Sequence, residues 1–134
     1  MTQNHTGSLK HTSFIERRRR RSSIAALAVR YQLEAVRERG DFPALVLADD
    51  QGLVVAAAGD PELCEELAAH APLIARAAIS RTRMTPRLRG AEVEVRPLHL
   101  PDGLLHLACV GGPAARDALL DHSARGVHRI LTHH

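Results

Sequence analysis

Apolar residues between positions 24 and 36 fall on two opposite faces of one helix. The first face consists of Ile24, Leu27, Ala28, Tyr31 and Ala35, and the second of Ala25, Val29, Leu33 and Val36. A helix on a protein surface needs only one apolar stripe. The second stripe therefore predicts that this helix is covered on both sides, either by another helix of its own fold or by a partner.

This first helix has two candidate starts. Ser13 and Glu16 have the spacing of a capping box, which predicts a helix from Phe14 to Arg39 that Gly40 ends. Alternatively, Ser22 or Ser23 caps a shorter helix. The arginines that precede these serines would then lie in a flexible arm.

Two short apolar runs follow, separated by a polar turn. Residues 44–48 and 53–58 are apolar, and Asp49-Asp50-Gln51-Gly52 between them has the composition of a hairpin turn. Asp60 and Pro61 then form a strong helix start. We expect a helix from Pro61 to about Ser80, with a kink near Pro72. Its apolar stripe consists of Leu63, Leu67, Ala71, Ile74 and Ala78.

The second half of the chain repeats the strand-strand-helix order. Residues 81–90 are basic and irregular, and residues 91–100 then alternate between apolar and charged positions. The alternation shifts after Pro97, which indicates a bulge or an edge strand. A turn at residues 101–103 leads into an apolar strand, and the last helix runs from the Gly111-Gly112-Pro113 segment to about Thr132. This order predicts an α+β fold, an α/β/α sandwich with one antiparallel sheet covered by helices on both faces.

The order of elements over residues 24–132, and the hairpin "ALVLADDQGLVVAAAG" in particular, resembles the roadblock/dynein light-chain family. The resemblance implies a non-enzymatic, homodimeric scaffold or regulator that docks a small Ras-like GTPase or a motor, polarity or motility complex. It also implies that the dimer contact uses one face of the second helix, formed here by Leu63, Leu67, Ala71 and Ile74. The family has five strands, whereas "RTRMTPRLRG" is a poor strand, so we expect four to five. The arginine-rich lead and Pro72 also depart from the family pattern.

Composition adds an asymmetry of charge. The 134 residues suit a single domain, and a hydrophobic content of 45% is enough for a core. The net charge is +3, but residues 1–30 hold seven basic residues against one acidic residue. We expect a disordered lead at 1–12, an arginine-rich extension at 13–23 and the domain at 24–132. The apolar run after the arginines is too short for an export signal or a membrane span, which predicts a cytoplasmic protein.

No residue pattern in the chain predicts a catalytic, metal or cofactor site. The nine histidines form no zinc-binding motif, although His99 and His106 could approach each other on adjacent strands. Cys64 and His70 stand on different sides of their helix, so we expect Cys64 to be a packing residue, and Cys109 likewise a buried thiol. Gly111-Gly112 lacks the lysine of a phosphate-binding loop and is interpreted as a turn.

The run Arg17, Arg18, Arg19, Arg20 and Arg21 has three interpretations. It is a solubilising extension, a contact for an acidic protein or membrane, or a contact for nucleic-acid phosphates. The last would make the protein nucleic-acid-associated, which is the alternative to the scaffold function. Ser22 and Ser23 have arginines three residues before them and are candidate phosphorylation positions.

Overall fold

The computed structural model describes the backbone of residues 5–133 and the side chains of residues 23–80 and 82–133. The order of elements is α1 (His5–Gly40), β1 (Ala44–Asp49), β2 (Val54–Gly59), α2 (Pro61–Ala75), a 3-10 turn η2 (Arg81–Arg83), α3 (Pro86–Arg89), β3 (Val93–Leu100), β4 (Gly103–Val110) and α4 (Arg116–His133). Its long elements therefore confirm the predicted α+β order of helix, two strands, helix, two strands and helix.

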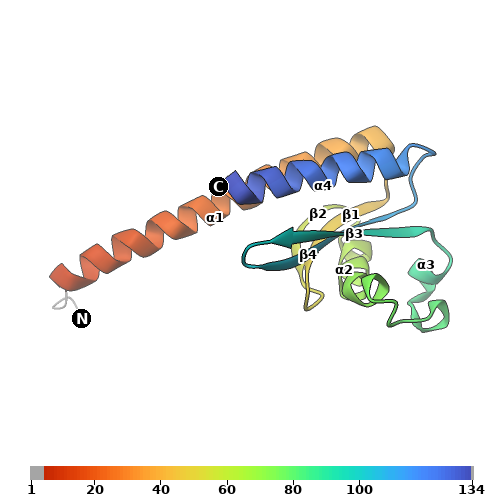
Figure 1. Cartoon of the computed structure of the whole chain (residues 1–134), viewed down its shortest axis with the longest axis horizontal. Coiled ribbons are helices and arrows are strands. Elements are labelled where there is room, and N and C mark those ends of the chain that lie inside the picture. The colour runs from red at the N-terminus through yellow and green to blue at the C-terminus, as the bar shows by residue number, and fades with distance from the viewer. Residues whose placement is uncertain (1–4, 134) are drawn as a thin grey trace.

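The four strands of the described region form one antiparallel sheet in the order β2-β1-β4-β3. Helices α1 and α4 lie side by side on one face of the sheet, and α2 covers the other face (Figure 1). The sheet is thus the middle layer of the predicted sandwich. No fifth strand occurs in the described region, since residues 81–90 form η2 and α3 instead.

Each face of the sheet has its own apolar core. On the α1/α4 side, Val29 and Leu33 of α1 pack with Leu45 and Leu107 of the sheet and Leu120 of α4, all nearly or fully buried. The core on the α2 side is built from smaller residues, which let that helix approach the sheet closely: Ala44, Val46, Ala48, Cys64, Leu67, Ala68, Ala71 and Ala108.

Strand β3 contributes apolar residues to both faces. Its register with β4 is regular from Val93 to Leu100, so there is no bulge at Pro97, and β3 is an edge strand. Val93 and Val95 pack on the α2 side, whereas Leu98 belongs to the α1/α4 core. This change of face explains the shift in alternation along the sequence. The sheet irregularity lies instead between Leu47 and Ala48, opposite β2.

The helix boundaries differ from the expectation at several points. Helix α1 begins at His5, so residues 5–12, expected in a disordered lead, belong to the same helix as the expected Phe14–Arg39 segment, while residues 1–4 lie outside the described part. No helix break marks positions 12 or 23, and the division there stays a prediction. Helix α2 continues past Pro72 but ends at Ala75 rather than Ser80, and Ala77 has a positive φ of 53°.

Within the described residues, the structure contains no helix both long enough and apolar enough to cross a membrane.

Candidate interaction surfaces

The face of α2 expected to form the dimer is buried inside the same chain. Leu63, Leu67 and Ala71 are 7%, 0% and 0% exposed, because they pack against β1 and β4. Among the four expected residues, Ile74 alone is partly exposed. The sheet of the same chain covers most of the stripe that was expected to form the dimer, so a contact through α2 has to use the opposite side of the helix.

That opposite side, which we call the outer face of α2, consists of Glu62, Glu65, Ala69 and Leu73. Leu73 is 38% exposed and is the large apolar residue of this face. Helix α2 starts firmly, since the Asp60 side chain accepts a hydrogen bond from the backbone N–H of Leu63 at 3.1 Å.

The 81–90 segment, expected to be a poor strand, is tied to α2 by Arg87. Its guanidinium forms ion pairs with Asp60 and with Glu66, the latter at 3.3 Å. The hydrogen bond from Arg87, followed by that from Leu63, lowers the pKa of Asp60. Leu88, at the centre of α3, is fully buried in the α2-side core. The 81–90 segment therefore packs as a short helical cover over the start of α2.

The outer edge of β3 is half closed. The carbonyl of Glu92 accepts a hydrogen bond from the backbone N–H of Gly111 at 2.8 Å. The backbone N–H and C=O groups of the even-numbered residues therefore point toward β4, and those of the odd-numbered residues point outward. Of the outward positions, Pro97 has no N–H, and the His99 carbonyl accepts a hydrogen bond from Nε2 of His128 at 3.3 Å. The Val95 carbonyl accepts a hydrogen bond from Nη1 of Arg96 at 3.4 Å, so Val93 is the outward position in β3 that retains both backbone groups for another strand.

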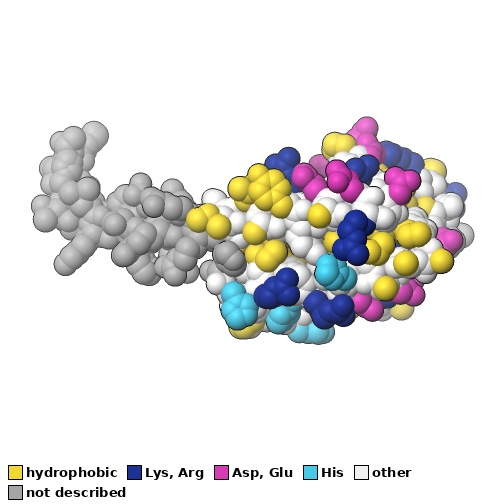
Figure 2. Space-filling view, turned by 90° about the horizontal axis from the view of Figure 1, so that it is seen from above, with side chains coloured by type: hydrophobic (Ala, Val, Ile, Leu, Met, Phe, Trp, Pro, Cys, Tyr) yellow, Lys and Arg dark blue, Asp and Glu magenta, His cyan; other side chains and the backbone are white. Residues whose placement is uncertain are grey.

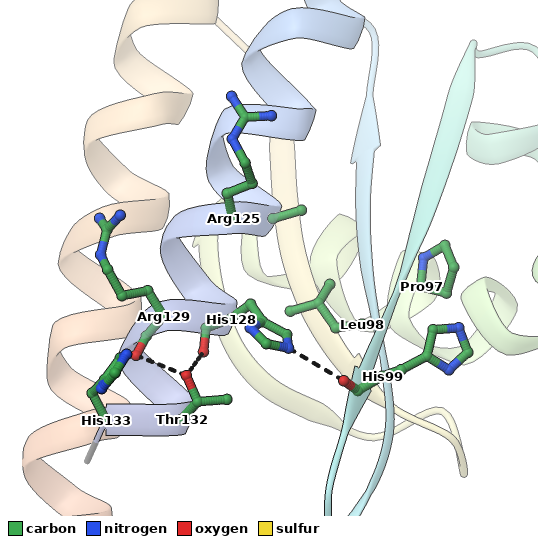
Figure 3. Close-up of a pocket in the computed structure, with 9 residues that line it drawn as sticks. Pro97, Leu98, His99, Arg125, His128, Arg129, Thr132 and His133 are labelled. Carbon is green, nitrogen blue, oxygen red and sulfur yellow. Dashed lines mark hydrogen bonds between the residues drawn. The ribbon is translucent and has the colours of Figure 1, made fainter.

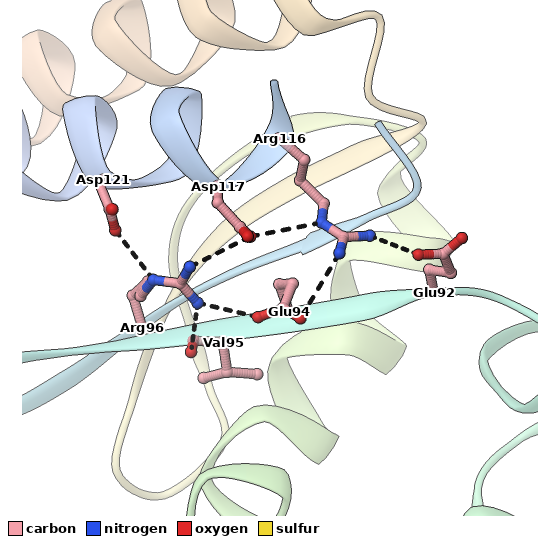
Figure 4. Close-up of polar contacts among 7 residues, drawn as sticks. All are labelled: Glu92, Glu94, Val95, Arg96, Arg116, Asp117 and Asp121. Carbon is pink, nitrogen blue, oxygen red and sulfur yellow. Dashed lines mark hydrogen bonds and ion pairs between the residues drawn. The ribbon is translucent and has the colours of Figure 1, made fainter. Parts of the chain in front are cut away.

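An ion-pair network joins β3 to the start of α4 (Figure 4). Arg96 contacts Glu94 at 2.9 Å, Asp117 at 3.2 Å and Asp121 at 2.9 Å. Arg116 contacts Glu92 at 2.8 Å. The hydrogen bonds from Arg96 to Glu94 and Asp121 raise the pKa of this guanidinium. The network fixes α4 on the sheet, and its four carboxylates outnumber its two guanidinium groups.

A second polar cluster holds the β1–β2 turn. Nε2 of His106, a side chain that is 1% exposed, lies 2.8 Å from Oδ1 of Asp50. Arg76, just past α2, donates to the same oxygen at 2.6 Å. The hydrogen bond with His106, and then the charge of Arg76, lower the pKa of Asp50. The cluster connects β4, the hairpin turn and the end of α2.

Histidines and arginines gather around a shallow hollow of about 600 Å³ between β3 and α4. His128 points from α4 toward β3, whereas Arg129 points away from it (Figure 3). His99 and His106 were expected to approach each other. The ring of His106 bonds to Asp50, and the backbone carbonyl of His99 accepts a hydrogen bond from His128, so neither of these bonds joins the two histidines. No group of three or more His, Cys, Asp or Glu side chains suited to a metal ion occurs among the described residues.

The two cysteines are buried free thiols, as expected. Sγ of Cys64 lies 3.4 Å from the carbonyl of Ala58, and burial raises its pKa. Burial also raises the pKa of Cys109, to about 11. Gly111 and Gly112 have positive φ angles and form the turn between β4 and α4.

The second apolar face of α1 is left uncovered within the described structure. Ile24, Leu27 and Tyr31 are 50%, 46% and 61% exposed. Figure 2 looks onto the layer of α1 and α4, where hydrophobic side chains lie exposed and histidine and arginine side chains gather on one side. Leu27 also borders a shallow groove that reaches Val55 of β2, which is 43% exposed. We expected this face to be covered either by another helix of the same fold or by a partner. In the described part of the chain, no other helix covers it.

The side chains of Arg17–Arg21 and of Ser22 lie outside the described residues, so their interpretations stay predictions. Their backbone belongs to α1, in the part that extends beyond the end of α4 (Figure 1). Ser23 is exposed and lies within the helix rather than at its start.

A four-stranded antiparallel sheet between a central helix and a pair formed by the first and last helices defines the fold, and this fold is roadblock-like, as the resemblance predicted. Two solved structures share it. MglB of Myxococcus xanthus matches with a TM-score of 0.52 and 9% identity, covering 80% of this chain and 90% of that one. The gliding protein MglB from Thermus thermophilus matches with a TM-score of 0.59 and 19% identity, covering 82% and 93%. No protein-family model and no curated protein sequence matches the chain.

Proposed function

We propose that this chain is a non-enzymatic, homodimeric interaction scaffold or regulator that docks a small Ras-like GTPase of a polarity or motility complex. The observation that carries the proposal is the fold shared with two MglB structures over at least 80% of the chain, one of which is described as a gliding protein. Identity this low supports the architecture, and the function is our extension from it.

The outer face of α2 is the surface we assign to docking. In the proposal, two copies bring their α2 helices together, and the paired helices form the platform. Leu73 supplies apolar area for contact, and Glu62 and Glu65 supply negative charge that selects the orientation of the docked GTPase. The first half of β3 is open for a short pairing between copies at Val93 and at the N–H of Val95, whereas Pro97 and the bond from His128 close the second half.

Binding of a purified Ras-like GTPase from the same genome tests the proposal. The full chain is titrated, in a calorimeter, with the GTPase loaded with GDP or with a non-hydrolysable GTP analogue. We expect binding that depends on the bound nucleotide. Leu73→Glu should weaken binding about tenfold or more, because it places a charge in the apolar part of the contact. Val55→Glu, on the side of β2 that faces α1, is the matched control and should bind like the wild type.

The same experiment can overturn the proposal. Absence of binding to every Ras-like GTPase of that genome in both nucleotide states would reject the docking function. If binding occurs, GTP hydrolysis and nucleotide exchange measured with and without the chain distinguish a regulator from a simple tether.

A further inference from the structure

We propose that the shallow hollow between β3 and α4 docks an acidic segment of a partner protein. An apolar side chain of that segment enters the hollow, and its carboxylates contact the arginines of α4. The hollow lies on the α1/α4 side of the sheet, away from the outer face of α2, so the inference does not depend on the GTPase proposal. Its basis is an apolar floor beside positive charge that no carboxylate of the described residues contacts.

The floor of the hollow is apolar and rests on the core. Leu98 of β3 is 3% exposed and belongs to the α1/α4 core, and Ala124 of α4 packs against the same core. Pro97 borders the hollow on the side of the strand. The ring of His128 reaches across from α4, and its Nε2 lies 3.3 Å from the carbonyl oxygen of His99 (Figure 3). The floor is therefore fixed by packing, and the space above it accepts an apolar side chain.

The rim of the hollow on α4 carries positive charge that is not neutralised. Arg125 and Arg129 are both exposed, and neither contacts a carboxylate among the described residues. Arg96 and Arg116 differ in this respect, because they contact four carboxylates between them. The helix holds no acidic residue after Asp121, which is paired with Arg96 at 2.9 Å. The charge of the second half of α4 is therefore available to an anion from outside.

The neighbouring elements supply little negative charge to the hollow. Helix α1 lies beside α4 (Figure 1), and its residues 23–31 include no acidic residue. Glu34, which follows that stretch, is bound by Arg30 at 3.1 Å. On β3, residues 95–101 are free of acidic residues, and the next one along the chain is Asp102 in the exposed turn before β4. The hollow is thus positive on balance from every element that borders it.

These features favour an acidic protein segment over other anions. Carboxylates complement the two arginines of the rim, and an apolar side chain between them covers the floor. The segment docks through its side chains, because Pro97 lacks an N–H and the His99 carbonyl already accepts a bond from His128, so this half of β3 does not take up a further strand. A nucleic acid has phosphates but no apolar side chain for the floor, and a flat anionic membrane would touch the rim without entering the hollow.

NMR spectroscopy of the full-length chain, labelled with nitrogen-15, tests the docking site. The probe is a synthetic peptide in which two leucines are flanked by glutamates. We expect chemical-shift changes in residues 97–99 and 124–133. R125E/R129E should weaken peptide binding about fivefold or more, because it reverses the charge of the rim. R39E/R83E makes an equal change of charge at two exposed positions outside the hollow, and this matched control should bind like the wild type. Circular dichroism checks that each variant is folded.

Two control peptides separate charge from apolar contact. A peptide with lysines in place of the glutamates should not bind, and one with serines in place of the leucines should bind about fivefold more weakly or less. The location of the shifts is decisive, since the arginines of residues 17–21 also attract an acidic peptide.

The proposal is overturned if the acidic peptide does not bind, if the shifts are confined to residues 17–30, if both arginine pairs have the same effect, or if the leucine and serine peptides bind equally. It is also overturned if duplex DNA, or vesicles of phosphatidylserine and phosphatidylcholine, shift the hollow residues more strongly than the peptide does. None of these outcomes changes the test of the outer face of α2, so the two proposals fail separately.

Discussion

Oγ of Ser123 in α4 donates a hydrogen bond to Oε1 of Gln32 in α1 at 2.7 Å, across a contact between two helices that lie far apart in the sequence. Ser123 is fully buried. Gly126, one turn further along α4, lies against the same glutamine, since a Cβ added there would be 2.8 Å from Nε2 of Gln32. A small residue and a hydrogen bond together set the closeness of α1 and α4.

Ser123→Ala should lower the free energy of unfolding by about 1–3 kcal/mol, because Gln32 loses its donor in a place that water reaches poorly. Urea unfolding followed by circular dichroism measures the change. Thr132→Ala, which removes an exposed hydroxyl bonded only within α4, is the control and should change the free energy by about 0.5 kcal/mol or less. Equal effects from the two substitutions would show that the bond between Ser123 and Gln32 does not hold the helices together.

The two sides of α2 should respond differently to truncation. Leu67→Ala removes a fully buried side chain and should cost about 2–5 kcal/mol of unfolding free energy. Leu73→Ala, on the outer face, should cost about 1 kcal/mol or less and should instead weaken self-association. Urea unfolding and light scattering on both variants separate these effects. A large loss of stability from Leu73→Ala would place that residue in the core and contradict the assignment of faces.

Asp50 should make the fold sensitive to acid. Because its pKa is lowered below 3.8 by His106 and Arg76, its carboxylate favours the folded state at higher pH. That contribution is complete above the unfolded value and is lost as the pH falls below 3.8. Urea midpoints measured from pH 7 to pH 2.5 should fall less steeply for Asp50→Asn than for the wild type. Asp102→Asn, at the exposed β3–β4 turn, should follow the wild-type curve; identical curves for all three proteins would contradict this role for Asp50.

The buried thiols should be inert in the folded protein. Cys109 has a pKa raised to about 11 by burial, from 9.0, so it stays neutral and protected at pH 8. A thiol reagent should therefore label Cys64 and Cys109 only at the rate of unfolding, and immediately in urea. The thiol of Cys109 favours the folded state fully below pH 9.0, and this contribution is lost as the pH rises through about 11. Fast labelling without denaturant would show that the sheet opens around β4.

Capping and turn residues predicted the helices and strands well, because each of these residues acts on the backbone within a few positions of itself. Asp60 and Pro61 start α2 as expected, the 49–52 turn closes the hairpin, and the poor strand at 81–90 is indeed not a strand. The end of α2 was wrong by five residues, since a run of small apolar residues continues past Ala75 although the chain turns at Ala77.

The surfaces were harder to predict, because an apolar stripe indicates that a face is covered without indicating what covers it. The stripe through Leu67 is covered by its own sheet, whereas the stripe through Leu27 is open. The network of Arg96 with Asp117 and Asp121 joins residues more than twenty positions apart, and it depends on how α4 lies across β3. The alternating charges of residues 92–96 marked that strand, but nothing local to it identified partners on a later helix.

The half-closed edge of β3 limits how many copies of the chain can add to the sheet through strand pairing. An open sheet edge invites strand after strand to add, which is the route to fibres. Pro97 has no N–H, and the carbonyl groups of Val95 and His99 accept hydrogen bonds from Arg96 and His128, so a neighbouring strand could pair with β3 only over a short length around Val93. If two copies pair as proposed, this edge of the sheet is protected against the continued addition of further copies.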